Sequence, residues 1–275
     1  MVKGLNEAFY SPEQWQISSL ETGAFAHLCE LFKVNELTDW PAPQWFSPFL
    51  TAINENNIPI TFEDDAKVEF GDRYYEQVIF ETGVVPTRSE NWHDLFGGFV
   101  WCLFPKTKAL INHRHVQDIA EHGLQQRTKH RNALTLFDEC GVVLAISESK
   151  WQQWLCDHQW KTAFVEHRHE WGKTIKPFMF GHANYEMLTK PYIGLTGKAL
   201  FVCVPNEIFC KDLVTQYQYL DQALYEMINT DNCLADNKKL SPLPLLGVPG
   251  WHDENKDDSF YNNTDYFRSK RRMRT

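Results

Sequence analysis

The sequence has no close cysteine pair, no long apolar run and no excess of positive charge, and each absence removes a class of protein. Its seven cysteines are scattered and odd in number, and no Cys-x-x-Cys occurs. A cysteine zinc site is therefore not expected, and the thiols fit a reducing cytoplasm. The apolar runs are far shorter than the roughly 20 residues of a membrane helix, and the first residues lack an apolar signal-peptide core. We expect a cytoplasmic protein with no membrane partner.

The charge balance also narrows the possible partners. The net charge is −9, which argues against a general nucleic-acid binder because phosphate contacts need a basic surface. The local exception is the C-terminal stretch RSKRRMRT, which could touch RNA or an acidic partner but is more typical of a disordered solubilising tail. A glycine-rich phosphate loop and a Gly-x-Ser-x-Gly motif are both absent from the sequence.

What the chain does contain is enough apolar material for a large core, with 275 residues of which 43% are hydrophobic. No regular alternation of strands and helices is present, so a doubly wound parallel sheet is not expected. We predict an α+β fold: a helix-dominated single domain with a small, mostly antiparallel sheet and an irregular C-terminal extension. The expected divisions are a helix-rich domain over 1–240, an extension over 241–268 that packs on it, and a basic disordered tail over 269–275.

Periodicity and capping signals predict the individual elements. The expected helices start at Ser11-Pro12 and lie over 25–32, 44–53, 73–83, 87–103, 105–123, 150–160, 162–171, 181–192 and 211–228. The helix from Thr87 rests on the capping-box spacing of Thr87 and Glu90. Strands are expected over 58–62 and 197–205, and the stretch 132–146 predicts a hairpin that turns at Asp138–Gly141. The acidic stretch over 63–72 predicts a solvated loop.

One helix combines a core pattern with polar groups. The stretch PTRSENWHDLFGGFVW places His93 and Asp94 on a strongly apolar helix, and Gly97 and Gly98 stack one turn above them. Either another element packs on the glycines and the polar pair is structural, or the notch admits a ligand on which the pair acts. A buried aspartate needs a partner because an unpaired buried charge costs several kcal/mol. Arg88 or a metal could serve Asp94 in this way.

Other polar groups carry similar alternatives. Asp138 and Glu139 form either a carboxylate pair for acid–base or metal chemistry, or simply part of a turn. His182 and Glu186 lie one helical turn apart, which suits a base or metal ligand but equally a surface pair. The stretches NHRH and EHRHE lack the spacing of a His-Glu-x-x-His zinc motif, so we interpret them as solvated helix faces.

The stretches VPTRSENWHDLFGGFVWCLFPKTKALIN, ALTLFDECG, GHANYE, LLGVPGW and FYNNTDYFR resemble, in this order, the bacterial domain-of-unknown-function family 3025. The resemblance runs from about the RYYEQ stretch to Arg268 and implies no particular reaction. It implies that a set of polar positions belongs together: Arg88, Asn91, His93, Asp94, Asn112, Asp138, Glu139, His182, Asn255, Tyr261, Thr264 and Arg268. The chain departs from the family pattern at Gly97, where asparagine is frequent, and at Asn132, where the pattern has aspartate.

Two functions remain open on this evidence. The first is a cytoplasmic hydrolase of a small or nucleotide-like substrate, which a divalent metal could assist. Here His93 is the general base, Arg88 holds an anionic group, and Asp94, Asp138 and His182 are metal ligands or orienting groups. This hypothesis requires His93 to lie within about 10 Å of His182 or Asp138. The second is a non-enzymatic binding or interaction protein whose polar residues are structural. The substrate and the oligomeric state stay open.

Overall fold

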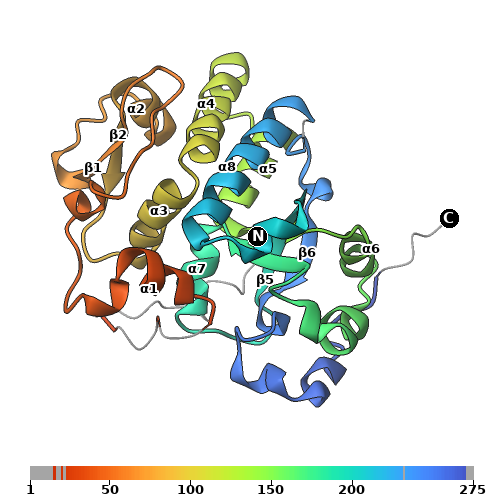
Figure 1. The fold of residues 1–275 in the computed structure, drawn as a ribbon. Helices are drawn as coiled ribbons and strands as arrows, with labels where there is room; N and C mark the ends of the chain where they lie inside the picture. The colour runs from red at the N-terminus through yellow and green to blue at the C-terminus, as the bar shows by residue number, and fades with distance from the viewer. Residues whose placement is uncertain (1–14, 17–19, 21–22, 232, 271–275) are drawn as a thin grey trace.

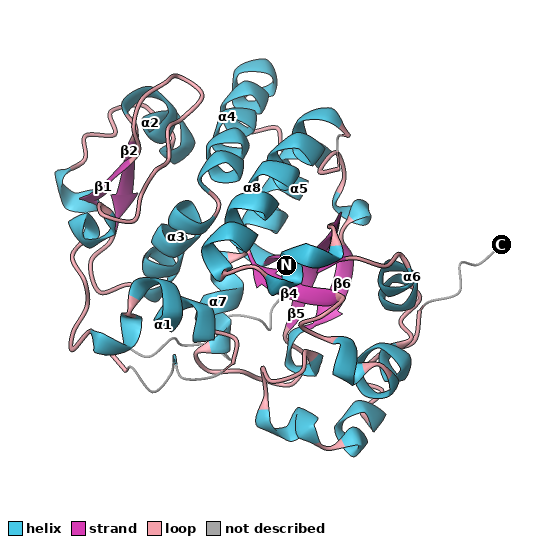
Figure 2. Ribbon diagram, viewed as in Figure 1, coloured by secondary structure: helices cyan, strands magenta, loops and turns pink. Residues whose placement is uncertain are grey.

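Helices surround two separate β-sheets in the computed structural model, which describes residues 15–16, 20, 23–231 and 233–270 (Figures 1 and 2). The α-helices are α1 (Ala26–Phe32), α2 (Tyr75–Thr82), α3 (Trp92–Leu103), α4 (Pro105–His122), α5 (Lys129–Cys140), α6 (Lys150–Cys156), α7 (His182–Leu188) and α8 (Leu213–Thr230). The strands are β1 (Thr61–Asp64), β2 (Val84–Thr87), β3 (Gly141–Ile146), β4 (Ile175–Met179), β5 (Thr196–Cys203) and β6 (Ser241–Pro244). The expected helix start at Ser11-Pro12 and residues 271–275 of the expected basic tail lie outside the described residues.

The larger sheet has the strand order β4-β3-β5-β6. Its central strand β3 pairs antiparallel with β4 and parallel with β5, and β6 pairs antiparallel with β5. Every residue of β3 is buried, as expected for a strand covered on both faces. The sheet is thus small and mostly antiparallel within a helix-rich α+β fold, which confirms the predicted fold class. The parallel pair of β1 and β2 forms a second sheet that the sequence did not predict.

Helix α3 lies at the centre of the molecule, between the β1–β2 pair and the larger sheet (Figure 1). Its expected apolar stripe is confirmed, because Trp92, Phe96 and Phe99 are almost completely buried. The far side is also covered, since Trp101 is 3% exposed. A helix that is apolar nearly all round packs against several elements at once, and this one therefore holds its polar residues at fixed places in the core.

The hairpin predicted over 132–146 is wrong. Residues up to Cys140 belong to α5, and only the second half of the stretch is a strand, β3. The Thr128 side chain caps α5 by accepting a hydrogen bond from the Arg131 amide, and Ala133, Leu134 and Phe137 form its buried face. Their helical spacing outweighs the β-propensity of the stretch. Glu139 consequently stands in the last turn of a helix.

The boundaries of other elements also differ from the predictions. Helix α3 does not begin at Thr87, which ends β2; its cap is Asn91, whose Oδ1 accepts a hydrogen bond from the Asp94 amide. The helix expected over 44–53 shrinks to one 3₁₀ turn, Pro43–Phe46. The helix expected over 162–171 is a short π-helical segment followed by a 3₁₀ turn.

The strands were predicted less well than the helices. The strand expected over 58–62 begins later, at Thr61, and continues to Asp64, two residues into the stretch expected to be a loop. Strands β2, β4 and β6 were not predicted. Each of these three contains a proline, a residue that disfavours a strand interior because it cannot donate to the ladder.

The C-terminal segment packs on its own chain. It starts with β6, where the division expected after residue 240 falls, and continues as 3₁₀ turns. The buried Asn255 side chain donates to the carbonyl oxygens of Leu246 and Val248, and Arg168 donates to its Oδ1. Within the residues that the structure describes, no helix is both long and apolar enough to pass through a bilayer.

Candidate functional site

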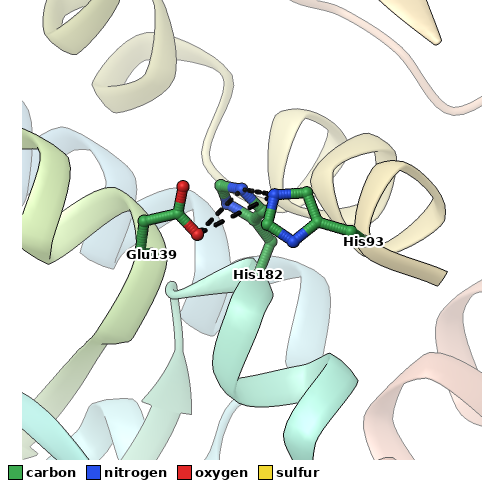
Figure 3. A group of neighbouring side chains, drawn as sticks. All are labelled: His93, Glu139 and His182. Carbon is green, nitrogen blue, oxygen red and sulfur yellow. Dashed lines mark hydrogen bonds and ion pairs between the residues drawn. The ribbon is translucent and has the colours of Figure 1, made fainter. Parts of the chain in front are cut away.

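Three side chains from three separate helices point toward one another (Figure 3). His93 belongs to α3, Glu139 to the end of α5, and His182 is the first residue of α7. The two Nε2 atoms are 3.0 Å apart. Glu139 Oε2 lies 3.5 Å from His182 Nε2 and 3.8 Å from His93 Nε2. The requirement that His93 lie close to His182 is therefore met.

A close approach of two backbones brings Glu139 and His182 together. The amides of Phe180 and Gly181 both donate to the Gly141 carbonyl, which ties the start of α7 to the junction of α5 and β3. A Cβ at Gly181 would lie 2.5 Å from the Glu139 carbonyl oxygen and 2.5 Å from the Gly141 nitrogen. Only glycine fits this contact. The Gly-His pair in the sequence is thus the local reason why His182 reaches Glu139.

A carboxylate stands behind each imidazole. His93 Nδ1 lies 3.1 Å from Glu186 Oε2, so this nitrogen donates and Nε2 keeps its lone pair when the ring is neutral. His182 Nδ1 is buried without a hydrogen-bond partner, and Asp138 Oδ2 lies 3.9 Å from it. Lys108 Nζ in turn holds Asp138 Oδ1 at 2.6 Å. Carboxylates in this outer position commonly orient metal-binding histidines.

The electrostatics of the cluster favour a cation. Burial lowers the pKa of His182 to about 4, so this ring is neutral near pH 7. Burial opposes the charged form of His93, but the Glu186 hydrogen bond and the charges of Glu139 and Glu186 outweigh it and raise the His93 pKa. Burial, together with the charges of Asp138 and Glu186, raises the pKa of Glu139. Neighbouring carboxylates thus contribute to the raised pKa values of both His93 and Glu139, and a bound cation would neutralise that negative charge.

The donor set and its spacing fit a divalent metal ion. Three ligand atoms of His93, Glu139 and His182 lie within 4.8 Å of one another. Two imidazole nitrogens and one carboxylate oxygen are a common set for catalytic zinc, whose bonds of about 2.0–2.2 Å place tetrahedral ligands roughly 3.3–3.5 Å apart. The measured separations of 3.0, 3.5 and 3.8 Å bracket this value. A ring that binds metal through Nε2 carries its proton on Nδ1, and the Asp138 carboxylate lies on that side of His182, with Oδ2 3.9 Å from Nδ1.

The remaining predicted site residues lie beside this cluster and not in it. Asp94 accepts from Arg88 three times: its Oδ2 from the backbone amide at 2.6 Å and Nε at 3.0 Å, and its Oδ1 from Nη2 at 2.7 Å. Arg88 is thus the partner of the half-buried Asp94. Asp138 is held by Lys108. Glu139, which the sequence offered only as half of a carboxylate pair, is the third member of the cluster.

The cluster borders a cavity of roughly 370 Å³ that is lined by polar and aromatic side chains. The sequence left open whether the two glycines of α3 allow close packing or leave space for a ligand, and the structure supports a different interpretation for each glycine. A Cβ at Gly98 would meet the Phe46 ring at 2.4 Å, whereas a Cβ at Gly97 would meet nothing within 4 Å. Gly98 therefore serves packing, and Gly97, which lines the cavity, leaves space beside His93.

Several cavity residues were missed by the sequence analysis. The interpretation of NHRH as a solvated helix face is wrong for Asn112 and His115, which are buried. Lys108, Asn112 and His115 all line the cavity from α4, although only Asn112 was named as a site position, from the family resemblance. Their spacing of four and three residues places them on one helix face, and all three are buried. A buried polar stripe of this kind is the signal that could have found them. Tyr75 and Glu76 of α2 also line the cavity and carried no such signal.

Comparison with known proteins gives one positive result. The family model described as Protein of unknown function (DUF3025) matches residues 60–271, a range that contains every residue of the cluster and its outer carboxylates. No curated protein matches the chain, and no solved structure does. The resemblance stated from the sequence is thus confirmed over most of the chain. The chain belongs to the family described as Protein of unknown function (DUF3025).

Proposed function

We propose that this protein is a metal-dependent hydrolase that acts on a small substrate. The observation that carries the proposal is the convergence of His93, Glu139 and His182, whose ligand atoms come from three helices and lie within 4.8 Å of one another. Three protein ligands leave coordination positions open, which is the pattern of catalytic and not structural zinc sites. A bound divalent ion would supply Lewis acidity and lower the pKa of water toward neutrality.

The residues around the ligands have separate tasks in this proposal. Glu186 accepts the Nδ1 proton of His93 at 3.1 Å and so directs Nε2 toward the ion. Asp138 lies behind His182, with Oδ2 3.9 Å from Nδ1, which is too long for a hydrogen bond, and acts on that ring through its charge. Burial opposes the ionised form of Asp138, but Lys108 and His182 outweigh it and lower the Asp138 pKa, so this carboxylate stays charged. His93 becomes a ligand and is no longer a candidate general base.

The cavity limits the size of the substrate, and the cysteines bear on the compartment in which the protein works. A volume of roughly 370 Å³ suits a small molecule and not a polymer. No disulfide joins any of the seven cysteines, all of which lie in the described part of the chain. This supports work in a reducing compartment, and we place the protein in the bacterial cytoplasm.

Metal content and hydrolysis measured together test the proposal. Untagged protein is purified and its metal is counted by elemental mass spectrometry in wild type, His182→Gln and the matched control His122→Gln, which changes a histidine at the far end of α4. We expect close to one metal per chain in wild type and control, and loss in a folded His182→Gln. Metal-loaded wild type should also cleave one or more members of a p-nitrophenyl ester and phosphate panel. Absence of metal from all three proteins, together with no saturable zinc uptake, would overturn the proposal.

A further inference from the structure

We propose that the cavity recognises a substrate carrying a cationic nitrogen, with Glu76 as its carboxylate partner and Tyr75 as an aromatic wall. The reaction site rests on the proposed function, but the recognition of the cation does not.

The cavity lining is acidic. The charged side chains that line it, besides three histidines, are the carboxylates of Asp65, Glu76, Asp94, Asp138 and Glu139 and the cations of Arg88 and Lys108. Both cations are already neutralised, Arg88 by Asp94 at 2.7 Å and Lys108 by Asp138 at 2.6 Å. Glu139 is assigned to the metal. Among the described residues, the carboxylates that remain without a partner of opposite charge are those of Asp65 and Glu76, so a substrate meets negative charge there.

Glu76 is held in place by a buried amide. Asn112, 2% exposed, donates from Nδ2 to Glu76 Oε2 at 2.6 Å and to the Glu76 carbonyl at 2.9 Å. In the described part of the chain, no lysine, arginine or histidine forms an ion pair with Glu76. Asn112 Oδ1 is buried and accepts no hydrogen bond, although the residue lies in the cavity wall. A fixed carboxylate without an ion-pair partner in the cavity wall calls for a cationic donor, and an ammonium group supplies several N–H groups.

Aromatic rings stand beside this carboxylate. Tyr74, Tyr75 and Phe70 line the cavity, and Tyr75 keeps 39% of its surface exposed. Burial of its hydroxyl, followed by the charges of Glu76, Asp94 and Asp138, raises the pKa of Tyr75 well above its usual value. An electron-rich ring next to a carboxylate is the arrangement that binds ammonium groups.

The charge balance of the cavity lining also disfavours an anionic substrate. Arg88, the group expected from the sequence to hold an anion, already directs Nε and Nη2 to Asp94. In this cavity both cations, Arg88 and Lys108, are already paired with carboxylates, whereas the carboxylates of Asp65 and Glu76 are not paired with a cation in the part of the chain that the structure describes. A nucleotide or phosphate would therefore meet uncompensated negative charge. The nucleotide-like alternative is therefore the less favoured substrate class.

Three probes of nearly equal shape test the inference. Benzylammonium, benzyl alcohol and benzoate differ in charge while sharing one ring, so their affinities separate charge from apolar contact. Binding is measured by isothermal titration calorimetry on full-length protein stripped of metal with EDTA, because amine coordination to a metal is then excluded. We expect benzylammonium to bind about tenfold more tightly than benzyl alcohol, as a charge-assisted hydrogen bond would give, and benzoate to bind most weakly. Equal or reversed affinities would overturn the inference, whatever the fold of any variant.

Matched variants locate the cation. Glu76→Gln should reduce benzylammonium affinity to that of benzyl alcohol, whereas Glu81→Gln, an exposed acid on the same helix that is paired with Arg73, should leave it unchanged. An unchanged affinity in Glu76→Gln would contradict the assignment. His182→Gln separates this inference from the proposed function: it removes a metal ligand without changing charge at neutral pH, so amine binding should persist. Amine selectivity in a protein that takes up no metal would overturn the hydrolase proposal and leave the cation site standing.

Discussion

Replacement of Gly181 by alanine should disrupt the candidate metal site without changing its proposed ligands, His93, Glu139 and His182. The backbone φ of Gly181 is −69°, which any residue adopts, so the position demands space and not flexibility. A Cβ there would lie 2.5 Å from two backbone atoms. These atoms cannot rotate away, so α7 and the α5–β3 junction would have to separate by about 0.9 Å to reach ordinary van der Waals contact.

The size of the effect follows from this displacement. Overpacking costs about 1–3 kcal/mol, and weakening the 2.7 Å hydrogen bond from the Gly181 amide to the Gly141 carbonyl adds about 1 kcal/mol. For a chain of this size that loss lowers Tm by roughly 5–10 °C. A shift of His182 from Glu139 by much more than about 0.2 Å also exceeds the tolerance of a metal site. We therefore expect zinc affinity to fall at least about tenfold.

Gly97→Ala is the matched control. It makes the same chemical change on the opposite side of the cluster, where a Cβ would meet nothing within 4 Å. Alanine should stabilise α3 there by up to about 1 kcal/mol through helix propensity. Thermal unfolding followed by circular dichroism and zinc competition with a chromophoric chelator measure both quantities. A Gly181→Ala protein with wild-type Tm and zinc affinity would refute the packing argument.

Three further predictions concern the groups behind the ligands and the core. Glu186→Gln should weaken zinc binding about tenfold, measured against the exposed control Glu226→Gln; equal affinities would argue against an orienting role. Lys108→Met should destabilise the protein by about 3 kcal/mol in urea unfolding because it leaves Asp138 buried and unpaired, and Lys108→Met/Asp138→Asn should recover most of that loss; failure to recover would show that packing, not charge, is at stake. Burial lowers the pKa of His27 to about 3, so between pH 6.5 and 3 the unfolded chain binds a proton that the folded chain does not, and stability falls as the pH is lowered through this window. Urea unfolding at pH 7 and 4.5 should show up to about 2 kcal/mol less acid destabilisation in His27→Gln than in wild type, and identical pH dependence would contradict it.

The helices were largely predictable because their signals are local. Pro105 marks the start of α4 and Gly83, with φ of 73°, the end of α2, and both effects act within one turn of chain. The strands were harder. Each pairs with a partner distant in sequence, as β3 does with β5 across α6, β4 and α7, and such pairing leaves no local periodicity in a fully buried strand.

The sequence pointed to the two histidines of the candidate site, but it did not show which carboxylate lies beside them. His93 stood out because a polar group in an apolar helix needs an explanation, and His182 because Glu186 follows it one helical turn later. Which carboxylate joins them depends on how α5 ends, and the wrong hairpin hid that. As the last turn of a helix, the stretch sends Asp138 toward Lys108 and Glu139 toward the histidines. The different surroundings of Asp138 and Glu139 arise from tertiary contacts, which the sequence does not show.

The most direct test of the account is the coordination shell of the metal in purified protein, measured by X-ray absorption at the metal edge. The account predicts nitrogen and oxygen neighbours at about 2.0–2.2 Å with two imidazole scatterers and no sulfur, and their loss in His182→Gln. A sulfur shell near 2.3 Å, or an imidazole signal that survives in that variant, would contradict the assignment of His93, Glu139 and His182 as the metal site.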